Sequence, residues 1–220
     1  MQKNMCKLLI LSFGFQLLFC VFNTAQNLAS QVLDDLGFGS MGFYSLGVLY
    51  FAFSFSCFVA TPIVNKCGER FAMTIGALCY TLYTGCFILA SAPQKFPDQA
   101  DSLWVFNEGL IRAIILITAA INGFGASILW VAQGRYLARI ANDSNKGTFN
   151  SIFWAFFMSS QIIGALFAAI VLQNTDAFTF YCIMTSICLL ASLFFLFLQP
   201  VEPEAAEVVE DGDYQSLTRA

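Results

Sequence analysis

The sequence predicts an all-α integral membrane protein with six transmembrane helices. Hydrophobic residues make up 58% of the chain and charged residues only 11%, whereas a soluble domain carries roughly 25% charged residues. The apolar residues also gather into six blocks of about 20 residues, the length that a helix needs to cross a hydrocarbon core about 30 Å thick. Because lipid cannot hydrogen-bond a peptide group, each block is helical or belongs to a closed barrel, and none alternates as barrel strands do.

The six predicted spans are separated by loops of unequal length. They cover residues 8–27, 44–64, 71–91, 113–132, 152–172 and 177–198. In each half of the chain, a medium loop joins the first two spans and a short loop joins the next two. This pattern predicts one half of a transporter-like fold, built from two three-helix repeats of opposite orientation, a 3+3 inverted repeat.

The first span follows Lys3 and Lys7, so a cleaved signal peptide is the competing interpretation. Its length of about 20 residues and the lack of a small-x-small cleavage site favour a permanent span. A permanent span also explains the polar residues on one face of this helix, which are Ser12, Gln16, Asn23, Gln26 and Asn27.

This polar face must point into protein or a wet cavity, because an unpaired amide costs free energy in lipid. Two interpretations stay open: the side chains hydrogen-bond neighbouring helices, or they line a cavity that binds a substrate. Gln133 and Gln161, near the same end of the fourth and fifth spans, join Gln16, Asn23, Gln26 and Asn27 as the candidate substrate-binding residues. The nearby Trp130 and Trp154 are expected to contact a partner if the protein is an accessory to another membrane protein.

The second and third spans are joined by the loop motif Lys66, Gly68, Glu69 and Arg70. We expect Gly68 to permit a tight turn, and the two basic residues to meet helix C-termini and a carboxylate such as Glu69.

The fourth and fifth spans carry small residues at intervals of four. This spacing lets two helix backbones approach closely and predicts a surface for helix packing or for a partner. The residues are Ala119, Gly123 and Ser127 in the fourth span, and Ser160, Gly164 and Ala168 in the fifth.

Basic residues predict the orientation in the membrane. With these spans, eight of the ten Lys and Arg residues share one side, and only Lys95 and Arg112 lie opposite. Both termini are therefore expected in the cytoplasm. The membrane that holds the protein is expected to be the plasma membrane or an endomembrane. Residues 1–199 form the predicted membrane domain, and residues 200–220 form an acidic cytoplasmic tail that we expect to be disordered. This tail contains Tyr214-Gln215-Ser216-Leu217, which fits a tyrosine-based sorting signal.

The sequence disfavours several classes of function. The chain has no histidine, and no predicted span contains an acidic residue, so we find no catalytic constellation, no metal site and no cofactor motif. Its acidic balance argues against nucleic acid as a partner. We therefore predict a protein that is not an enzyme.

The segment PIVNKCGERFAMTIG from Pro62 resembles the signature between the second and third spans of the major facilitator superfamily. Four further segments are FNTAQNLA from Phe22, SLGVLYFAFSFSCFVATPIV from Ser45, GASILWVAQGRYL from Gly125 and NSIFWAFFMSSQIIG from Asn150. Together these four resemble the Unc-ninety-three-like branch of that superfamily, the ion channel regulatory proteins. The resemblance implies that the chain corresponds to the amino-terminal six-span half of a twelve-span fold. It is then a six-span protein that pairs with a second chain, a truncated isoform, or an incomplete gene model.

Two functions follow from the resemblance and the residues. The first is a non-enzymatic regulator or chaperone of another membrane protein, such as an ion channel. The alternative is a transporter of a small solute, acting with a second six-span half. The expected partners are the lipid bilayer and either another membrane protein or a second copy of the chain.

Overall fold

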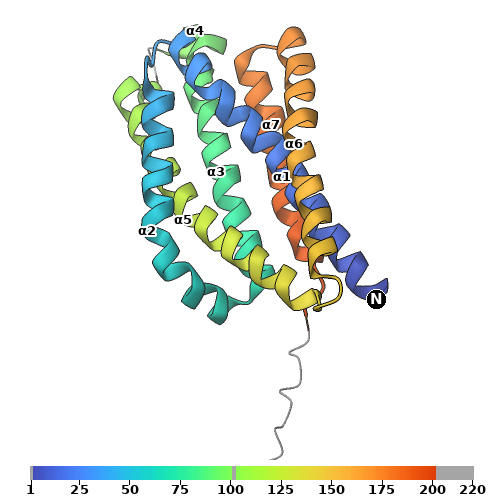
Figure 1. Ribbon diagram of the computed structural model, residues 1–220. Helices are drawn as coiled ribbons and strands as arrows, with labels where there is room; N and C mark the ends of the chain where they lie inside the picture. Colours follow the sequence, from blue (N-terminus) through green and yellow to red (C-terminus); the bar gives the residue numbers. More distant parts are fainter. Residues whose placement is uncertain (1, 101–102, 202–220) are drawn as a thin grey trace, which may run out of the picture.

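The computed structural model describes residues 2–100 and 103–201, which form a bundle of long helices (Figure 1). Six helices are long and apolar enough to cross a membrane, and the described residues contain no strand. This confirms the predicted all-α, six-span class. The long helices are α1 (Gln2–Asp35), α2 (Met41–Cys67), α3 (Glu69–Lys95), α5 (Glu108–Ile140), α6 (Lys146–Asn174) and α7 (Ala177–Phe194), and the short ones are α4 (Pro97–Ala100), η1 (Trp104–Phe106) and η2 (Phe195–Phe197).

Most of the helices are longer than the predicted spans. The first span was expected over residues 8–27, but α1 runs from Gln2 to Asp35. Hydropathy marks only the part of a helix that matches the hydrocarbon core, whereas the polar turns beyond it remain helical. The connections are correspondingly short, and Gly68 alone separates α2 from α3. Its φ of 79° lies in the left-handed region that glycine adopts at low cost.

The two halves of the bundle pack in the same pattern. Helix α1 packs against α6 and α7, α5 packs against α2 and α3, and α3 also packs against α7. Exchanging α1, α2 and α3 with α5, α6 and α7 leaves this pattern unchanged. Helices α1 and α5 also run in opposite directions, α1 away from the end that carries the N-terminus and α5 toward it (Figure 1). This is the arrangement expected of an inverted three-helix repeat.

The stripes of small residues bring helix backbones into contact. A Cβ atom built on Gly123 would lie 2.2 Å from the carbonyl oxygen of Leu49 in α2, and one on Gly164 would lie 2.2 Å from that of Cys20 in α1. All six stripe residues are buried. The stripes therefore face neighbouring helices of the same chain, and α1 and α2 occupy the faces that a partner would need.

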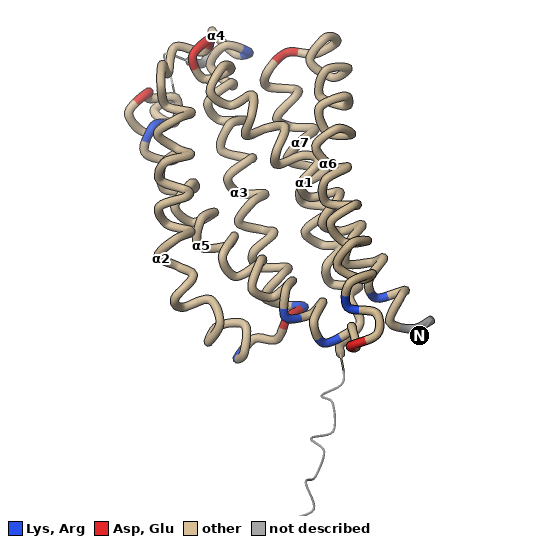
Figure 2. Tube along the Cα trace, in the orientation of Figure 1, with Lys and Arg blue, Asp and Glu red and all other residues tan. Residues whose placement is uncertain are grey.

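The two ends of the bundle differ in charge. We call the end near the N-terminus the basic end, because most of the Lys and Arg residues gather there (Figure 2). At the opposite end, Lys95 of α3 donates to the carboxylate of Asp176, which precedes α7, with a nitrogen–oxygen distance of 2.5 Å. This hydrogen bond and one from the backbone N–H of Thr179 lower the pKa of Asp176 to about 2. The carboxylate therefore keeps its charge through the neutral pH range.

Candidate functional site

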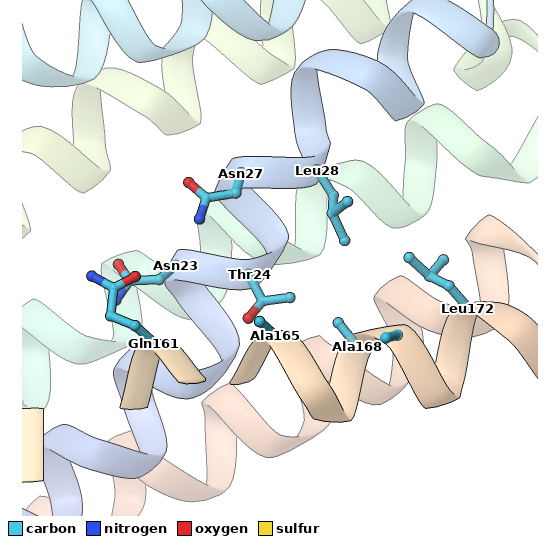
Figure 3. Close-up of a pocket in the computed structure, with 9 residues that line it drawn as sticks. Asn23, Thr24, Asn27, Leu28, Gln161, Ala165, Ala168 and Leu172 are labelled. Atoms are coloured by element: carbon cyan, nitrogen blue, oxygen red, sulfur yellow. The ribbon is translucent and has the colours of Figure 1, made fainter. Parts of the chain in front are cut away.

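A cleft with a volume of about 220 Å³ lies between α1 and α6, and we call it the amide cleft. Figure 3 shows its amide side chains grouped in one part of the cleft, with Leu28 and Leu172 in the other. The amides belong to Asn23, Asn27 and Gln161, of which Asn27 and Gln161 are exposed. The remaining lining residues are Thr24, Leu28, Ala165, Ala168, Ala169 and Leu172.

A second hollow with a volume of about 240 Å³ adjoins the first at Asn23, which lines both. We call it the aromatic pocket, because seven of its lining side chains are aromatic. Residues from five of the six long helices meet here: Phe19, Phe22, Asn23 and Gln26 of α1, Leu49, Tyr50 and Phe53 of α2, Tyr80 of α3, Ala126 and Trp130 of α5, and Phe157 of α6.

The rings of the aromatic pocket pack mainly edge to face. The ring centroids of Phe22 and Tyr80 are 4.5 Å apart, those of Phe19 and Phe157 are 4.9 Å apart, and those of Trp130 and Phe157 are 5.2 Å apart. Such pairs stabilise one another beyond their apolar area. Five of the seven rings therefore support one another around the hollow, namely Phe19, Phe22, Tyr80, Trp130 and Phe157.

The polar face of α1 divides between the two roles that the sequence left open. Gln16 donates from Nε2 to Oγ of Ser159 at 2.8 Å and so joins α1 to α6. Asn23 instead lines both hollows, and its Nδ2 atom is buried without a hydrogen-bond partner among the described residues. Oε1 of Gln26 is also buried without a hydrogen-bond partner among the described residues, whereas its Nε2 donates to the hydroxyl of Tyr50 at 3.4 Å.

Three of the six predicted substrate-binding residues line the amide cleft, and Gln26 lines only the aromatic pocket. Gln16 and Gln133 lie outside both hollows. Gln133 is 7% exposed and follows Trp130 by one turn toward the basic end, so it is buried beyond the aromatic pocket.

Sequence reasoning missed most of the aromatic wall and one buried amide. Phe19 and Phe22 precede Asn23 on the same helix, within about one turn of it, but phenylalanine is too common in this chain, at 25 residues, for these two to stand out in the sequence. Asn122 of α5 is fully buried, and neither amide atom has a partner within the described part of the chain. An asparagine in the middle of a predicted span was the signal that could have found it.

The loop motif contributes to an ion cluster at the basic end. The carboxylate of Glu69 lies 2.7 Å from Nη1 of Arg139 and 2.9 Å from Nε of Arg135, and both arginines belong to α5. Glu69 therefore pairs with α5 instead of with the neighbouring Lys66 or Arg70. Adjacent residues of a helix do not face each other, whereas two arginines one turn apart on α5 share a face.

The segment that follows η2 is tied to the same cluster. Arg139 donates to the carbonyl of Val201 at 3.1 Å, Tyr136 to that of Gln199 at 2.9 Å, and Lys7 to that of Pro200 at 3.1 Å. These bonds join α1 and α5 to the chain beyond α7. Apart from Pro200 and Val201, the expected acidic tail lies outside the described residues, and so does the Tyr214 motif.

The described part of the chain contains no group of three His, Cys, Asp or Glu side chains that could hold a metal ion. All eight cysteines are free, and Cys86 and Cys188 are buried.

Comparison with known proteins identifies the family. The family model described as "Ion channel regulatory protein UNC-93" matches residues 39–94 and 105–217, which is most of the chain. The chain belongs to the UNC-93 family. This confirms the resemblance to the Unc-ninety-three-like branch of the major facilitator superfamily, and the chain is an integral, multi-pass membrane protein of that branch.

Named relatives of the UNC-93 family come from animals and plants. The chain is 30% identical to "UNC93-like protein MFSD11" of Xenopus tropicalis over 94% of this chain and 44% of the relative. It is 33% identical to "UNC93-like protein 3" of Arabidopsis thaliana over 75% of this chain and 32% of the relative. It is 29% identical to "Protein unc-93 homolog A" of Bos taurus over 78% of this chain and 35% of the relative. The chain thus spans less than half the length of these relatives, and no solved structure matches it.

Proposed function

We propose that this chain is a non-enzymatic accessory protein that binds another membrane protein, such as an ion channel, and controls its activity or delivery. The description of the UNC-93 family as ion channel regulatory supports this role. The observation that carries the proposal is the exposure of Asn27 and Gln161 on the apolar bundle. An amide that faces lipid has no hydrogen-bond partner. Covering this face with protein or water therefore lowers the free energy.

The accessory role predicts that the exposed amides help to hold a partner. We expect the double variant Asn27→Leu/Gln161→Leu to retain less than a tenth of the partner membrane protein that co-purifies with the wild-type chain. Native mass spectrometry of the detergent-extracted complex, with identification of its components, measures this loss.

A matched control for this experiment is Gln31→Leu, which removes an exposed amide from α1 outside both hollows. The control should keep the partner. If the double variant and the control retain equal amounts of partner, the amide face is not the contact. A homodimer in place of a heteromeric complex would count against the accessory role and favour the alternative below.

We also propose that the basic end lies in the cytoplasm, because it carries most of the basic residues and short loops obey the positive-inside rule. A membrane-impermeant maleimide should then label the exposed Cys67, at the end of α2, only from the cytoplasmic side. Labelling of intact cells at Cys67 from outside would reverse this orientation.

The second candidate is transport of a small solute, with a second six-span half supplied by another chain or another copy. The two adjoining hollows favour it, because amides and aromatic rings together provide a site for a solute within a membrane-spanning bundle. Replacing Asn23, Asn27 and Gln161 together with alanine should lower the uptake of neutral radiolabelled solutes by at least tenfold. Uptake that is unchanged in this triple variant would remove the amide cleft from the transport path.

A further inference from the structure

We infer that the aromatic pocket and the amide cleft form one site for an uncharged ligand that carries an aromatic ring and a hydrogen-bonding group such as a carboxamide. The inference names the class of ligand for the transport alternative. It rests on that proposed function only for movement of the ligand across the membrane, because binding is measured separately. Its three supports are the shared wall at Asn23, the unpartnered polar atoms of α1, and the chemistry of the lining residues.

The shared wall fixes the shape of the site. Asn23 lines both hollows, so a ligand that contacts its amide reaches the rings on one side and the other amides on the opposite side. A cavity of about 150 Å³ accommodates one benzene ring. Each hollow alone, at about 240 Å³ or 220 Å³, therefore has room for one ring or one short polar group. A ligand that occupies both is therefore elongated, with one apolar end and one polar end.

The unpartnered atoms specify hydrogen bonds. Nδ2 of Asn23 is a donor and Oε1 of Gln26 is an acceptor, and the two residues are three positions apart on α1, which places them on the same face. Neither atom has a partner among the described residues, although buried polar groups are normally hydrogen-bonded. A carboxamide supplies both an acceptor and a donor. Exchanging the oxygen and nitrogen of either side-chain amide would only replace an unpartnered donor by an acceptor, or the reverse, and a carboxamide pairs with both.

The lining excludes a formal charge on the ligand. The residues that line the two hollows, all of them within the described ranges, include no Asp, Glu, Lys or Arg. A charged ligand would lose its hydration without gaining a counter-charge. Attraction between a cation and the ring faces would offset only part of that loss. An aromatic group, in contrast, finds fixed ring edges and faces in the pocket, from Phe22 and Tyr80 to Trp130 and Phe157.

A charge series on one ring tests the inference directly. Phenylacetamide, phenylacetate and phenethylamine share a phenyl ring and a similar length, but are neutral, anionic and cationic at pH 7. We expect the full chain in lipid nanodiscs to bind radiolabelled phenylacetamide saturably in equilibrium dialysis, with a Kd at least tenfold lower than for either charged analogue. Equal or tighter binding of a charged analogue overturns the inference, and so does the lack of saturable binding by all three.

Variants place the binding in this site. Asn23→Leu should weaken phenylacetamide binding at least tenfold while leaving the melting temperature unchanged or higher, because it removes a buried unpartnered donor and keeps nearly the same shape. Phe157→Leu should also weaken binding by removing a ring, whereas Gln31→Leu on α1 should not. Binding that is unaffected by Asn23→Leu overturns the site.

Binding of phenylacetamide without its uptake would support the site and contradict transport. Failure of the inferred site and failure of the transport function are therefore distinguishable.

Discussion

Replacing Gly164 with alanine is expected to destabilise the bundle by about 3 kcal/mol, the upper part of the range for overpacking a core. The added Cβ atom would lie 2.2 Å from the carbonyl oxygen of Cys20 and 2.6 Å from Oγ1 of Thr24. A backbone carbonyl in a helix cannot swing away as a flexible side chain can, so α1 and α6 must separate along their contact. Thermal unfolding measured by labelling of the buried Cys86 and Cys188 with a thiol-reactive dye reports the change.

The control for this substitution is Gly47→Ala in α2, where an added Cβ atom meets nothing within 4 Å. Alanine is the better helix former, so this variant should melt at the wild-type temperature or above it, with a gain of up to about 1 kcal/mol. The two substitutions are chemically identical and are expected to have opposite signs. If Gly164→Ala melts no lower than Gly47→Ala, the close approach of α1 and α6 is not needed for stability.

The small-residue stripes were predictable from the sequence, but the helices that fill them were not. An interval of four in Ser160, Gly164 and Ala168 shows that some backbone comes close. It does not show whether that backbone belongs to the same chain or to a partner, because any helix fits such a groove. Only the packing of α1 on α6 assigns the stripe to the interior of the bundle.

The candidate site was predictable in its polar part and not in its aromatic part. A carboxamide in a membrane span is rare enough to be informative, which is why Asn23 and Gln161 could be chosen from the sequence. Phenylalanine is common in every span, so Phe19 and Phe157 acquire meaning only when helices distant in sequence meet around one hollow. The same limit applies to Glu69, whose partners Arg135 and Arg139 are about 70 positions away along the chain.

Neutralising Glu69 is expected to weaken the basic end of the bundle, with a loss of about 2 kcal/mol for Glu69→Gln. One carboxylate faces two arginines, and its side chain is only 11% exposed, so glutamine would leave Arg135 and Arg139 without their counter-charge. Breaking a fully buried pair costs about 3–5 kcal/mol. The arginines are 39% and 29% exposed, and water screens part of the loss, which sets the lower figure.

The matched control is Glu108→Gln, which removes the partner of Arg112 at the first turn of α5. This pair joins residues one turn apart, and the Glu108 side chain is 65% exposed, so the free energy of unfolding should change by no more than about 0.5 kcal/mol. Melting temperatures of the two variants in the same detergent make the comparison. Equal shifts would mean that Glu69 contributes no more than a surface ion pair. A larger shift for Glu69→Gln would mean that this carboxylate, at the start of α3, links α3 to α5 and, through Arg139, to the chain at Val201.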